Sequence, residues 1–317
     1  MILDPTKTAF LFPGQGSQAI GMGKALAESD MAAAQVFKQS DHILGYSLSS
    51  LCWEGTEVML NDTLYTQPAI LTHSVAVLMA FKSRYPNFAP TYTAGHSLGE
   101  FSALVAADAL NFHDALLLVQ ERGRAMKAAG EQYPGGMAAV LGLQVPEVEE
   151  ICQQISSEHT GGVWVANDNC PNQVVISGDR GTLSVASERL KERGARKVVA
   201  LSVSIAAHSP LMEPALEDFN QALRSTSIQD PQIQIIGNVN AEPLRSASDV
   251  RNDLGAQLTA RVRWTESILA MINAGITTFY ELGPGNVLTN LLRRIDRSAT
   301  GLALDSSASL NVVTVAQ

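Results

Sequence analysis

The stretch Gly95-His96-Ser97-Leu98-Gly99-Glu100 fits the pattern Gly-X-Ser-X-Gly and stands between a short β-prone run and a segment with helical spacing. In this pattern a serine occupies a sharp turn from a strand to a helix, and the crowded turn needs small residues two positions before and after it. The turn presents the hydroxyl of Ser97 at a helix N-terminus, where unpaired amides favour a developing negative charge. Ser97 is therefore a candidate nucleophile. The alternative is a glycine-flanked turn with a helix-capping serine.

Alternating strands and helices surround this turn. The sequence predicts strands over residues 8–12 and 92–95, and helices over residues 24–37, 68–80, 101–110 and 112–129. Such alternation favours a mostly parallel sheet with helices on both faces. Together with the serine turn, it predicts an α/β-hydrolase-like large domain.

A different order of elements follows residue 133. The pattern there is β-α-β-β-α-β, with strands over 137–143, 163–167, 173–177 and 197–203 and helices over 147–157 and 182–193. This is the order of a ferredoxin-like unit. We therefore expect an inserted ferredoxin-like subdomain at residues 133–203 and a catalytic body made of residues 1–132 and 204–317.

The second part of the body continues the mixed pattern. It predicts a helix over 211–223, strands over 233–239 and 278–282, and a helix over 286–297. The tail from Asp305 to Gln317 matches no motif and is a candidate for disorder.

Composition excludes several classes of protein. The chain has 317 residues, of which 46% are hydrophobic and 17% charged, as expected for a globular protein. Its 22 Lys and Arg against 31 Asp and Glu give a net charge of −9, which argues against nucleic-acid binding. We find no signal peptide and no apolar run of membrane-spanning length, so we expect a cytoplasmic protein without a membrane partner. We also expect a monomer. The three cysteines, Cys52, Cys152 and Cys170, have neither disulfide nor metal spacing and are predicted to be buried thiols.

A serine nucleophile needs a base, and His208 has the best setting among the histidines. It follows the apolar run 203–207, where a strand exit would place it at the carboxyl edge of the sheet, and it comes after Ser97 in the chain. A histidine that caps a helix start is the alternative. We expect His96 to point away from the site and His73 to pack inside a helix. Because no acid stands in an obvious place to orient His208, we predict a Ser-His dyad supported by a backbone carbonyl.

The negative charge of a tetrahedral intermediate needs two N–H donors. We predict the amide of Leu98, the residue after the serine, and the amide of Gln15 in the loop Pro13-Gly14-Gln15-Gly16-Ser17-Gln18. The same loop lacks the spacing of the common phosphate-binding motifs.

Arg122 stands among apolar neighbours on the predicted helix 112–129, whereas Arg124 has mostly polar ones. Arg122 therefore points inward, where an unpaired guanidinium is costly. It either meets an internal carboxylate or binds a carboxylate on the substrate, which its planar fork can hold through two parallel hydrogen bonds.

Six ordered motifs make the chain similar to one family, the malonyl-CoA:acyl carrier protein transacylases of fatty-acid synthesis. They are Phe12-Pro13-Gly14-Gln15-Gly16-Ser17-Gln18, Thr66-Gln67-Pro68-Ala69, Gly95-His96-Ser97-Leu98-Gly99-Glu100, Arg122-Gly123, Asn238-Val239-Asn240 and Glu281-Leu282-Gly283-Pro284-Gly285.

The resemblance implies roles for individual residues. It implies Ser97 as nucleophile, His208 as base, Gln15 in the oxyanion hole and Arg122 as the ligand of the malonyl carboxylate, and it implies that the main-chain carbonyl of Gln257 supports the histidine. With Arg122, we expect Met126 and Ala207 to bind the acyl group. The implied reaction moves a malonyl group from malonyl-CoA to the phosphopantetheine thiol of acyl carrier protein through a malonyl-serine, with no bound cofactor and no metal.

One departure from the family pattern bears on which acyl groups the pocket rejects. Family members commonly carry serine or phenylalanine where this chain has Ala207, and the smaller side chain weakens the expected rejection of branched groups such as methylmalonyl.

The alternative functions are a trans-acting acyltransferase of polyketide synthesis with relaxed selectivity, an acyl-thioester hydrolase, and a non-catalytic carrier-binding protein. The inward arginine argues against the hydrolase, and the joint presence of the four site residues argues against the scaffold.

Overall fold

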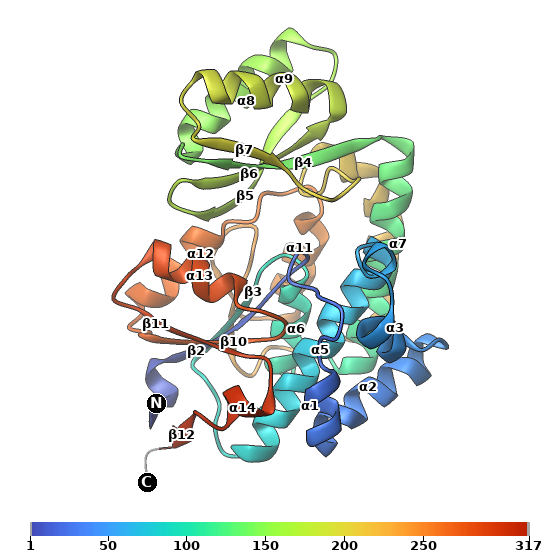
Figure 1. Ribbon diagram of the computed structural model, residues 1–317, viewed down its shortest axis with the longest axis vertical. Helices are drawn as coiled ribbons and strands as arrows, with labels where there is room; N and C mark the ends of the chain where they lie inside the picture. Colours follow the sequence, from blue (N-terminus) through green and yellow to red (C-terminus); the bar gives the residue numbers. More distant parts are fainter. Residues whose placement is uncertain (1, 316–317) are drawn as a thin grey trace.

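The large unit is built on a six-stranded sheet with the order β11-β10-β2-β3-β8-β9 in a computed structural model that describes residues 2–315 (Figure 1). Every neighbouring pair is parallel except β8 and β9. The mostly parallel α/β sheet predicted from the sequence is thus confirmed. Its strands are β2 (Thr8–Phe12), β3 (Tyr92–Gly95), β8 (Gln234–Ile236), β9 (Pro243–Leu244), β10 (Thr278–Leu282) and β11 (Thr300–Leu304).

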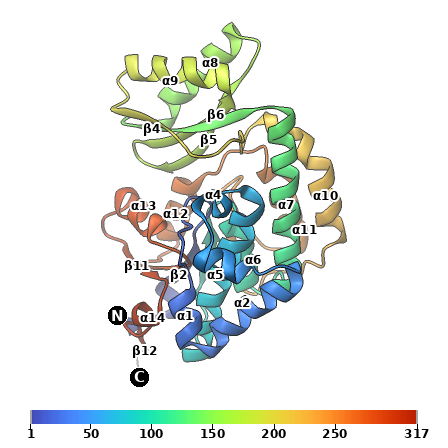
Figure 2. The ribbon, with the colours of Figure 1, turned by 45° about the vertical axis from the view of Figure 1, so that its right-hand side comes forward.

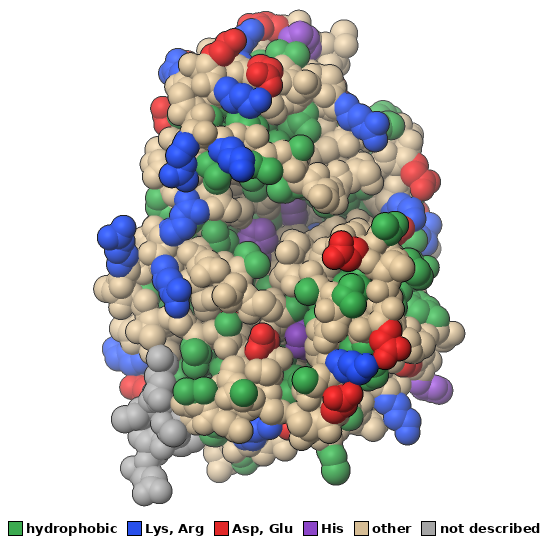
Figure 3. Space-filling model, in the orientation of Figure 1, with side chains coloured by type: hydrophobic (Ala, Val, Ile, Leu, Met, Phe, Trp, Pro, Cys, Tyr) green, Lys and Arg blue, Asp and Glu red, His purple; other side chains and the backbone are tan. Residues whose placement is uncertain are grey.

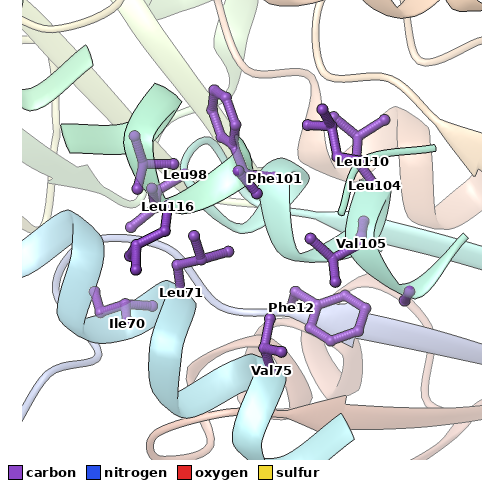
Figure 4. Close-up of a cluster of buried hydrophobic side chains, with 14 of the residues drawn as sticks. Phe12, Ile70, Leu71, Val75, Leu98, Phe101, Leu104, Val105, Leu110 and Leu116 are labelled. Carbon is purple, nitrogen blue, oxygen red and sulfur yellow. The ribbon is translucent and has the colours of Figure 1, made fainter. Parts of the chain in front are cut away.

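Helices cover both faces of this sheet, and β2 shows how the core is divided between them. Phe10 and Phe12 point into one cluster, which includes side chains of α5 (Thr63–Arg84), α6 (Gly99–Ala106) and α7 (Phe112–Gln132). Ala9 and Leu11 point into a second cluster against α12 (Trp264–Asn273) and α13 (Val287–Ile295). Successive side chains of a strand face opposite sides, so one short strand anchors both layers. Figure 4 shows Phe12 among leucine and valine side chains of the first cluster.

Helix α5 is long and apolar enough to cross a membrane by length and composition alone. However, 83% of its apolar window is buried inside the protein. The helix therefore has the surroundings of a core helix.

A second sheet carries the predicted ferredoxin-like pattern. Its strands have the order β5-β6-β4-β7 and are antiparallel throughout, with α8 (Val145–Glu158) and α9 (Arg180–Glu192) packed on it (Figure 1, top). Figure 2 shows α7 extending from the body to this sheet. The strands are β4 (Gly135–Leu141), β5 (Val163–Cys170), β6 (Gln173–Asp179) and β7 (Lys197–Ala200). The boundaries of the inserted unit at 133–203 and of the body at 1–132 and 204–317 stay a prediction.

Two predicted helices are interrupted. The helix expected over 24–37 is divided into α1 (Lys24–Ser29) and α2 (Met31–Leu44), because Asp30 adopts an extended conformation and its carboxylate caps the amides of Ala32 and Ala33. The helix expected over 211–223 starts as a 3₁₀ helix at Pro210–Ala215 and becomes α-helical only in α10 (Leu216–Ser225). Pro214 provides no amide for α-helical bonding at this junction.

The expectation of disorder for residues 305–317 is wrong up to residue 315. The segment contains α14 (Ser307–Leu310) and β12 (Thr314–Val315), and β12 pairs in parallel with β1 (Ile2–Leu3). The hydroxyl of Tyr85 donates to the carbonyls of Leu310 and Val313 and ties the segment to α5. Positions 316 and 317 lie outside the described residues.

Several elements were not predicted from the sequence. Besides β9, β11 and α12, they are a 3₁₀ turn at Pro5–Lys7, α3 (Leu48–Glu54), α4 (Glu57–Leu60) and α11 (Ala247–Gln257). The three cysteines are free and buried, as predicted.

Candidate active site

Ser97 occupies the sharp turn between β3 and α6 that the sequence predicts. Its φ of 51° lies in the left-handed region, which non-glycine residues rarely adopt. A Cβ on Gly95 would stand 1.9 Å from the carbonyl carbon of Gly99, and a Cβ on Gly99 would stand 2.0 Å from the carbonyl oxygen of Phe12. Both glycines are thus required by close backbone approach, and the pattern Gly-X-Ser-X-Gly is explained sterically.

Asn238, just beyond β8, fixes this turn from the neighbouring strand. Its Oδ1 accepts a hydrogen bond of 2.7 Å from the amide of Ser97, and its Nδ2 donates one of 2.7 Å to the carbonyl of Gly95. One buried side-chain amide therefore holds the strained serine and the residue that ends the strand. Such a buried, fully used amide resists the relaxation that strain would otherwise drive.

His208 lies directly beside the serine. Its Nε2 is 2.8 Å from Ser97 Oγ, and its Nδ1 is 2.9 Å from the carbonyl of Gln257 and 3.2 Å from that of Ala260. Since carbonyls only accept, Nδ1 carries the proton and Nε2 presents a lone pair to the serine hydroxyl. The predicted support by backbone carbonyls is present, and no carboxylate hydrogen-bonds the ring among residues 2–315.

Burial lowers the pKa of His208 to about 3, and the positive charge of Arg122 adds to the shift. The imidazole is therefore neutral at neutral pH. A neutral Nε2 is the form that can accept a proton from Ser97.

Arg122 points into the site from α7, as predicted. Its Nη2 donates to Ser97 Oγ at 3.2 Å and to Gln257 Oε1 at 2.9 Å, and its Nη1 donates to Gln67 Oε1 at 3.0 Å. The guanidinium also lies over the ring of Phe101, 5.8 Å from its centroid. All of its direct partners are neutral, and its Nε is buried without a partner among residues 2–315.

The internal carboxylate that was the alternative partner is absent from direct contact with Arg122. Within residues 2–315 no ion pair includes it, and Glu100 reaches it only through the side chain of Gln257. Burial lowers the pKa of Arg122 to about 10, while Glu100 opposes this shift. The guanidinium thus keeps its charge at neutral pH, and its Nε is a donor without an acceptor among residues 2–315.

A cavity of about 100 Å³ opens beside these groups, between the body and the small sheet. Gln15, Met126 and Ala207 line it, together with Met137, Asn167, Leu201, Val203 and Ile205. Figure 3 shows histidine side chains at the bottom of a hollow between the two parts of the molecule.

The amides of Gln15 and Leu98, the two predicted oxyanion donors, have no hydrogen-bond acceptor in the described part of the chain. Gly14 brings the loop close, since a Cβ on it would stand 2.3 Å from the carbonyl oxygen of His96. Free amides on a loop against the serine turn can receive an anionic oxygen.

The expectation that His96 points away is wrong, since this side chain also lines the cavity. Its Nε2 lies 2.8 Å from Asn169 Oδ1, and its ring packs edge-on against Trp264. These contacts with Asn169 on the small sheet and Trp264 on α12 hold the ring beside the cavity. His73 packs in the core as predicted, where burial lowers its pKa to about 4.

Three further residues contact the site although no sequence pattern gives them a role: Gln67, Glu100 and Asn238, which all belong to the family motifs. Their partners lie 55, 157 and 141 positions away in the chain. Such long-range contacts leave no periodic signal in a single sequence.

This fold with this serine and histidine defines a class, the α/β proteins that pass an acyl group through a serine, which includes transferases and hydrolases. Comparison with known proteins narrows the class. Residues 9–311 match the acyl transferase domain family, and the chain belongs to the malonyl-CoA:acyl carrier protein transacylases within it. It is 43% identical to the Bacillus subtilis member over 97% of this chain and 96% of the relative. It is 39% identical to the Haemophilus influenzae member over 97% and 98%, respectively.

Solved structures agree with this assignment. FabD of Acinetobacter baumannii has a TM-score of 0.93 and 41% identity, and the match covers 98% of this chain and 97% of that one. A malonyl-transacylase in complex with a type II polyketide acyl carrier protein has a TM-score of 0.93 and 36% identity, covering 96% and 98%. The fold-class prediction is therefore confirmed by experimental structures of the family.

Proposed function

We propose that this protein transfers the malonyl group of malonyl-CoA to the phosphopantetheine thiol of acyl carrier protein for fatty-acid biosynthesis. Ser97 is the nucleophile and His208 the base, with the amides of Gln15 and Leu98 as oxyanion donors. The observation that carries the proposal is the position of Arg122, a buried cation with only neutral partners whose Nη2 is 3.2 Å from Ser97 Oγ. A carboxylate one short chain away from an acylated serine is the group that such a cation fits.

The first half-reaction loads the serine. Ser97 Oγ attacks the thioester carbonyl while His208 Nε2 takes the hydroxyl proton, and the tetrahedral oxyanion forms against the two free amides. The carbon–sulfur bond then breaks, and the leaving CoA sulfur takes the proton from His208. A malonyl ester on Ser97 remains.

The second half-reaction repeats these steps in reverse with a new thiol. The phosphopantetheine thiol gives its proton to His208 and attacks the ester carbonyl, and Ser97 leaves with that proton. A thioester is replaced by a thioester, so the chemistry requires no bound cofactor or metal. Arg122 would hold the free carboxylate in both halves, and Met126 and Ala207 would contact the chain between the two ends.

The experiment that tests this function follows the fate of the malonyl group. With malonyl-CoA and holo acyl carrier protein, we expect malonyl on the carrier thiol to account for nearly all CoA released. If water receives the group at a similar rate with the carrier present, the protein is a hydrolase. If CoA release requires neither thiol nor serine, the proposal fails.

Polyketide synthesis is the second candidate pathway, because the malonyl-transacylase from the polyketide complex has the same TM-score, 0.93, as FabD of Acinetobacter baumannii, at 36% against 41% identity. In that case the pocket beside Ala207 would accept branched acyl groups. Comparing kcat/KM for malonyl-CoA and methylmalonyl-CoA separates the two pathways, because a narrow pocket that rejects one methyl group would raise the activation free energy for methylmalonyl-CoA by about 1–3 kcal/mol.

The pH profile of transfer follows from the environment of His208. We predict that kcat/KM stays flat through pH 6.5, the ordinary pKa of histidine, and falls only as the pH approaches about 3, where the base becomes protonated. Substituting Arg122 with Gln removes a charge that lowers this pKa, so the acid limb should move to higher pH. A wild-type limb near the ordinary histidine value would contradict the prediction.

We place the protein in the cytoplasm as a monomer, with no nucleic-acid or membrane partner and with acyl carrier protein as its macromolecular substrate. Carrier proteins of this type are acidic, and the net charge of this chain is −9, so docking needs a local basic surface. Figure 3 shows Lys and Arg side chains gathered along one edge, beside the small sheet and α13. Of the basic residues in these two regions, Lys191 and Arg193 pair with Glu188 and Glu150, and Arg294 bonds Gln173.

Four exposed residues there have no ion pair within residues 2–315: Arg196, Lys197, Arg293 and Arg297. Reversing these charges to Glu should raise KM for the carrier protein about tenfold at low salt and leave KM for malonyl-CoA unchanged. The same reversal at the paired residues Lys191 and Arg193 is the matched control and should have a smaller effect. An unchanged KM for the carrier in both variants would show that the carrier protein does not dock on this surface.

A further inference from the structure

Two buried acidic side chains lie next to Gln257 and have no role in the reaction described above. Glu100, on the first turn of α6, is fully buried, and Asp253 on α11 is nearly so. Burial raises the pKa of the Glu100 carboxyl group, and Asp253 acts on it electrostatically and raises it further. Two interacting carboxyl groups in a buried site do not both ionise readily, so one of them keeps its proton.

The surroundings decide which of the two carries the charge. Asp253 accepts hydrogen bonds from the amides of Asn238 and Val239, at 3.3 and 3.2 Å. Glu100 accepts only from Gln257 Nε2, at 2.6 Å, and its second oxygen has no hydrogen-bond partner among residues 2–315. Two backbone donors stabilise an anion better than one side-chain amide, so the charge belongs on Asp253 and the proton on Glu100.

Glu100 also determines how the Gln257 side chain is turned. Gln257 Nε2 donates to Glu100 Oε2 and, at 3.1 Å, to the carbonyl of Ser97, and Gln257 Oε1 accepts from Arg122. The reverse orientation would set an NH₂ group against the guanidinium and a carbonyl oxygen against two acceptors. By accepting from Gln257 Nε2, Glu100 Oε2 therefore keeps Gln257 Oε1, a neutral oxygen, directed at Arg122.

We propose that Glu100 is a positioning residue: it stands in the protein as a neutral acid beside the charged Asp253, and it holds Gln257 so that Arg122 is fixed by neutral groups and can still bind a substrate carboxylate. This inference rests on the proposed role of Arg122. Two ionised carboxylates here would instead place a second negative charge near Arg122 and compete with the substrate.

The titratable groups that act on Glu100 are Asp253 from α11 and Arg122 from α7. Burial and Asp253 raise the pKa of Glu100 well above its ordinary value, and Arg122 opposes the shift. A carboxyl with a raised pKa stabilises the folded state most fully below its unfolded pKa of about 4.3, and this contribution is lost as pH rises.

Glu100→Gln imitates the neutral acid permanently, because its side chain carries no charge at any pH while its carbonyl accepts from Gln257. We expect this variant to keep kcat/KM for malonyl-CoA within about threefold of wild type, and its Tm to fall less than that of wild type as pH rises above about 4.3. Glu100→Met has similar volume and no polar group. It should lower kcat/KM for malonyl-CoA about tenfold, mainly through KM, and change that for acetyl-CoA less than about twofold.

Glu281→Gln is the matched control. Glu281 is equally buried and accepts from the amides of Leu288 and Thr289, far from the serine turn, so its replacement should leave the malonyl-to-acetyl ratio unchanged. The inference is overturned if Glu100→Gln loses as much malonyl transfer as Glu100→Met, if both acyl groups suffer equally, or if Tm runs parallel in Glu100→Gln and wild type across this pH range. Should Glu100→Met fail to fold, the Glu100→Gln kinetics and the Tm comparison still decide. Absence of malonyl loading in the wild-type protein would overturn the proposed function instead, and the Tm comparison is independent of that result.

Discussion

His208→Ala is expected to lower kcat for malonyl transfer about 10³-fold, because general-base catalysis contributes roughly 10²- to 10⁴-fold and no second base is in place. His208 Nε2 is 2.8 Å from Ser97 Oγ, whereas the ring of His96 is engaged with Asn169. Both half-reactions pass their proton through His208, so steady-state turnover and single-turnover loading should fall together.

His73→Ala is the control for this prediction. His73 is also fully buried and has a lowered pKa, but it packs against α2 and the tail segment, away from the serine. We expect a lower Tm and an almost unchanged kcat. A His208→Ala protein that folds and still transfers malonyl at a tenth of the wild-type rate would show that another group serves as the base.

Arg122→Ala should lower kcat/KM for malonyl-CoA about 10- to 100-fold or more, because a hydrogen-bonded charged partner contributes about 1.5–3 kcal/mol. Acetyl-CoA has no carboxylate to lose this partner, so its kcat/KM should change much less. The ratio of the two substrates, measured on one preparation, separates substrate binding from a general disturbance of the site.

Arg124→Ala is the matched control two residues along the same helix. Arg124 points outward and pairs with Glu121 and Asp218, in contacts that are exposed to solvent. Exposed pairs contribute little, about 0–1 kcal/mol, so this variant should keep both activities. Equal loss of malonyl and acetyl transfer in Arg122→Ala would contradict the role assigned to the arginine.

The fold was predictable where a local rule applies. The strands 8–12, 92–95 and 278–282 match β2, β3 and β10 because short apolar runs bounded by turns are strong signals. The β-α-β-β-α-β order of the small unit was predictable for the same reason. The tail was mistaken for disorder because β12 is stabilised by pairing with β1, at the other end of the chain, and α14 by a capping box that the polar composition conceals.

The site residues were predictable where the role of a residue follows from its immediate neighbours in the sequence. Ser97 and its glycines follow from backbone crowding, and the inward direction of Arg122 follows from helical spacing. Gln67, Asn238 and the Glu100–Asp253 pair act through partners that are distant in sequence. Single-sequence spacing contains no information on such contacts, and only the folded arrangement reveals them.

The central claim is that the acid end of a malonyl group is held by Arg122 while its thioester end passes through Ser97. Intact-protein mass spectrometry after brief incubation with malonyl-CoA tests it most directly. We predict an increase of one malonyl group, located at Ser97 by peptide mapping, absent in Ser97→Ala and removed by holo acyl carrier protein much faster than by water. A protein that stays unmodified, or that carries the group on another residue, would contradict the account.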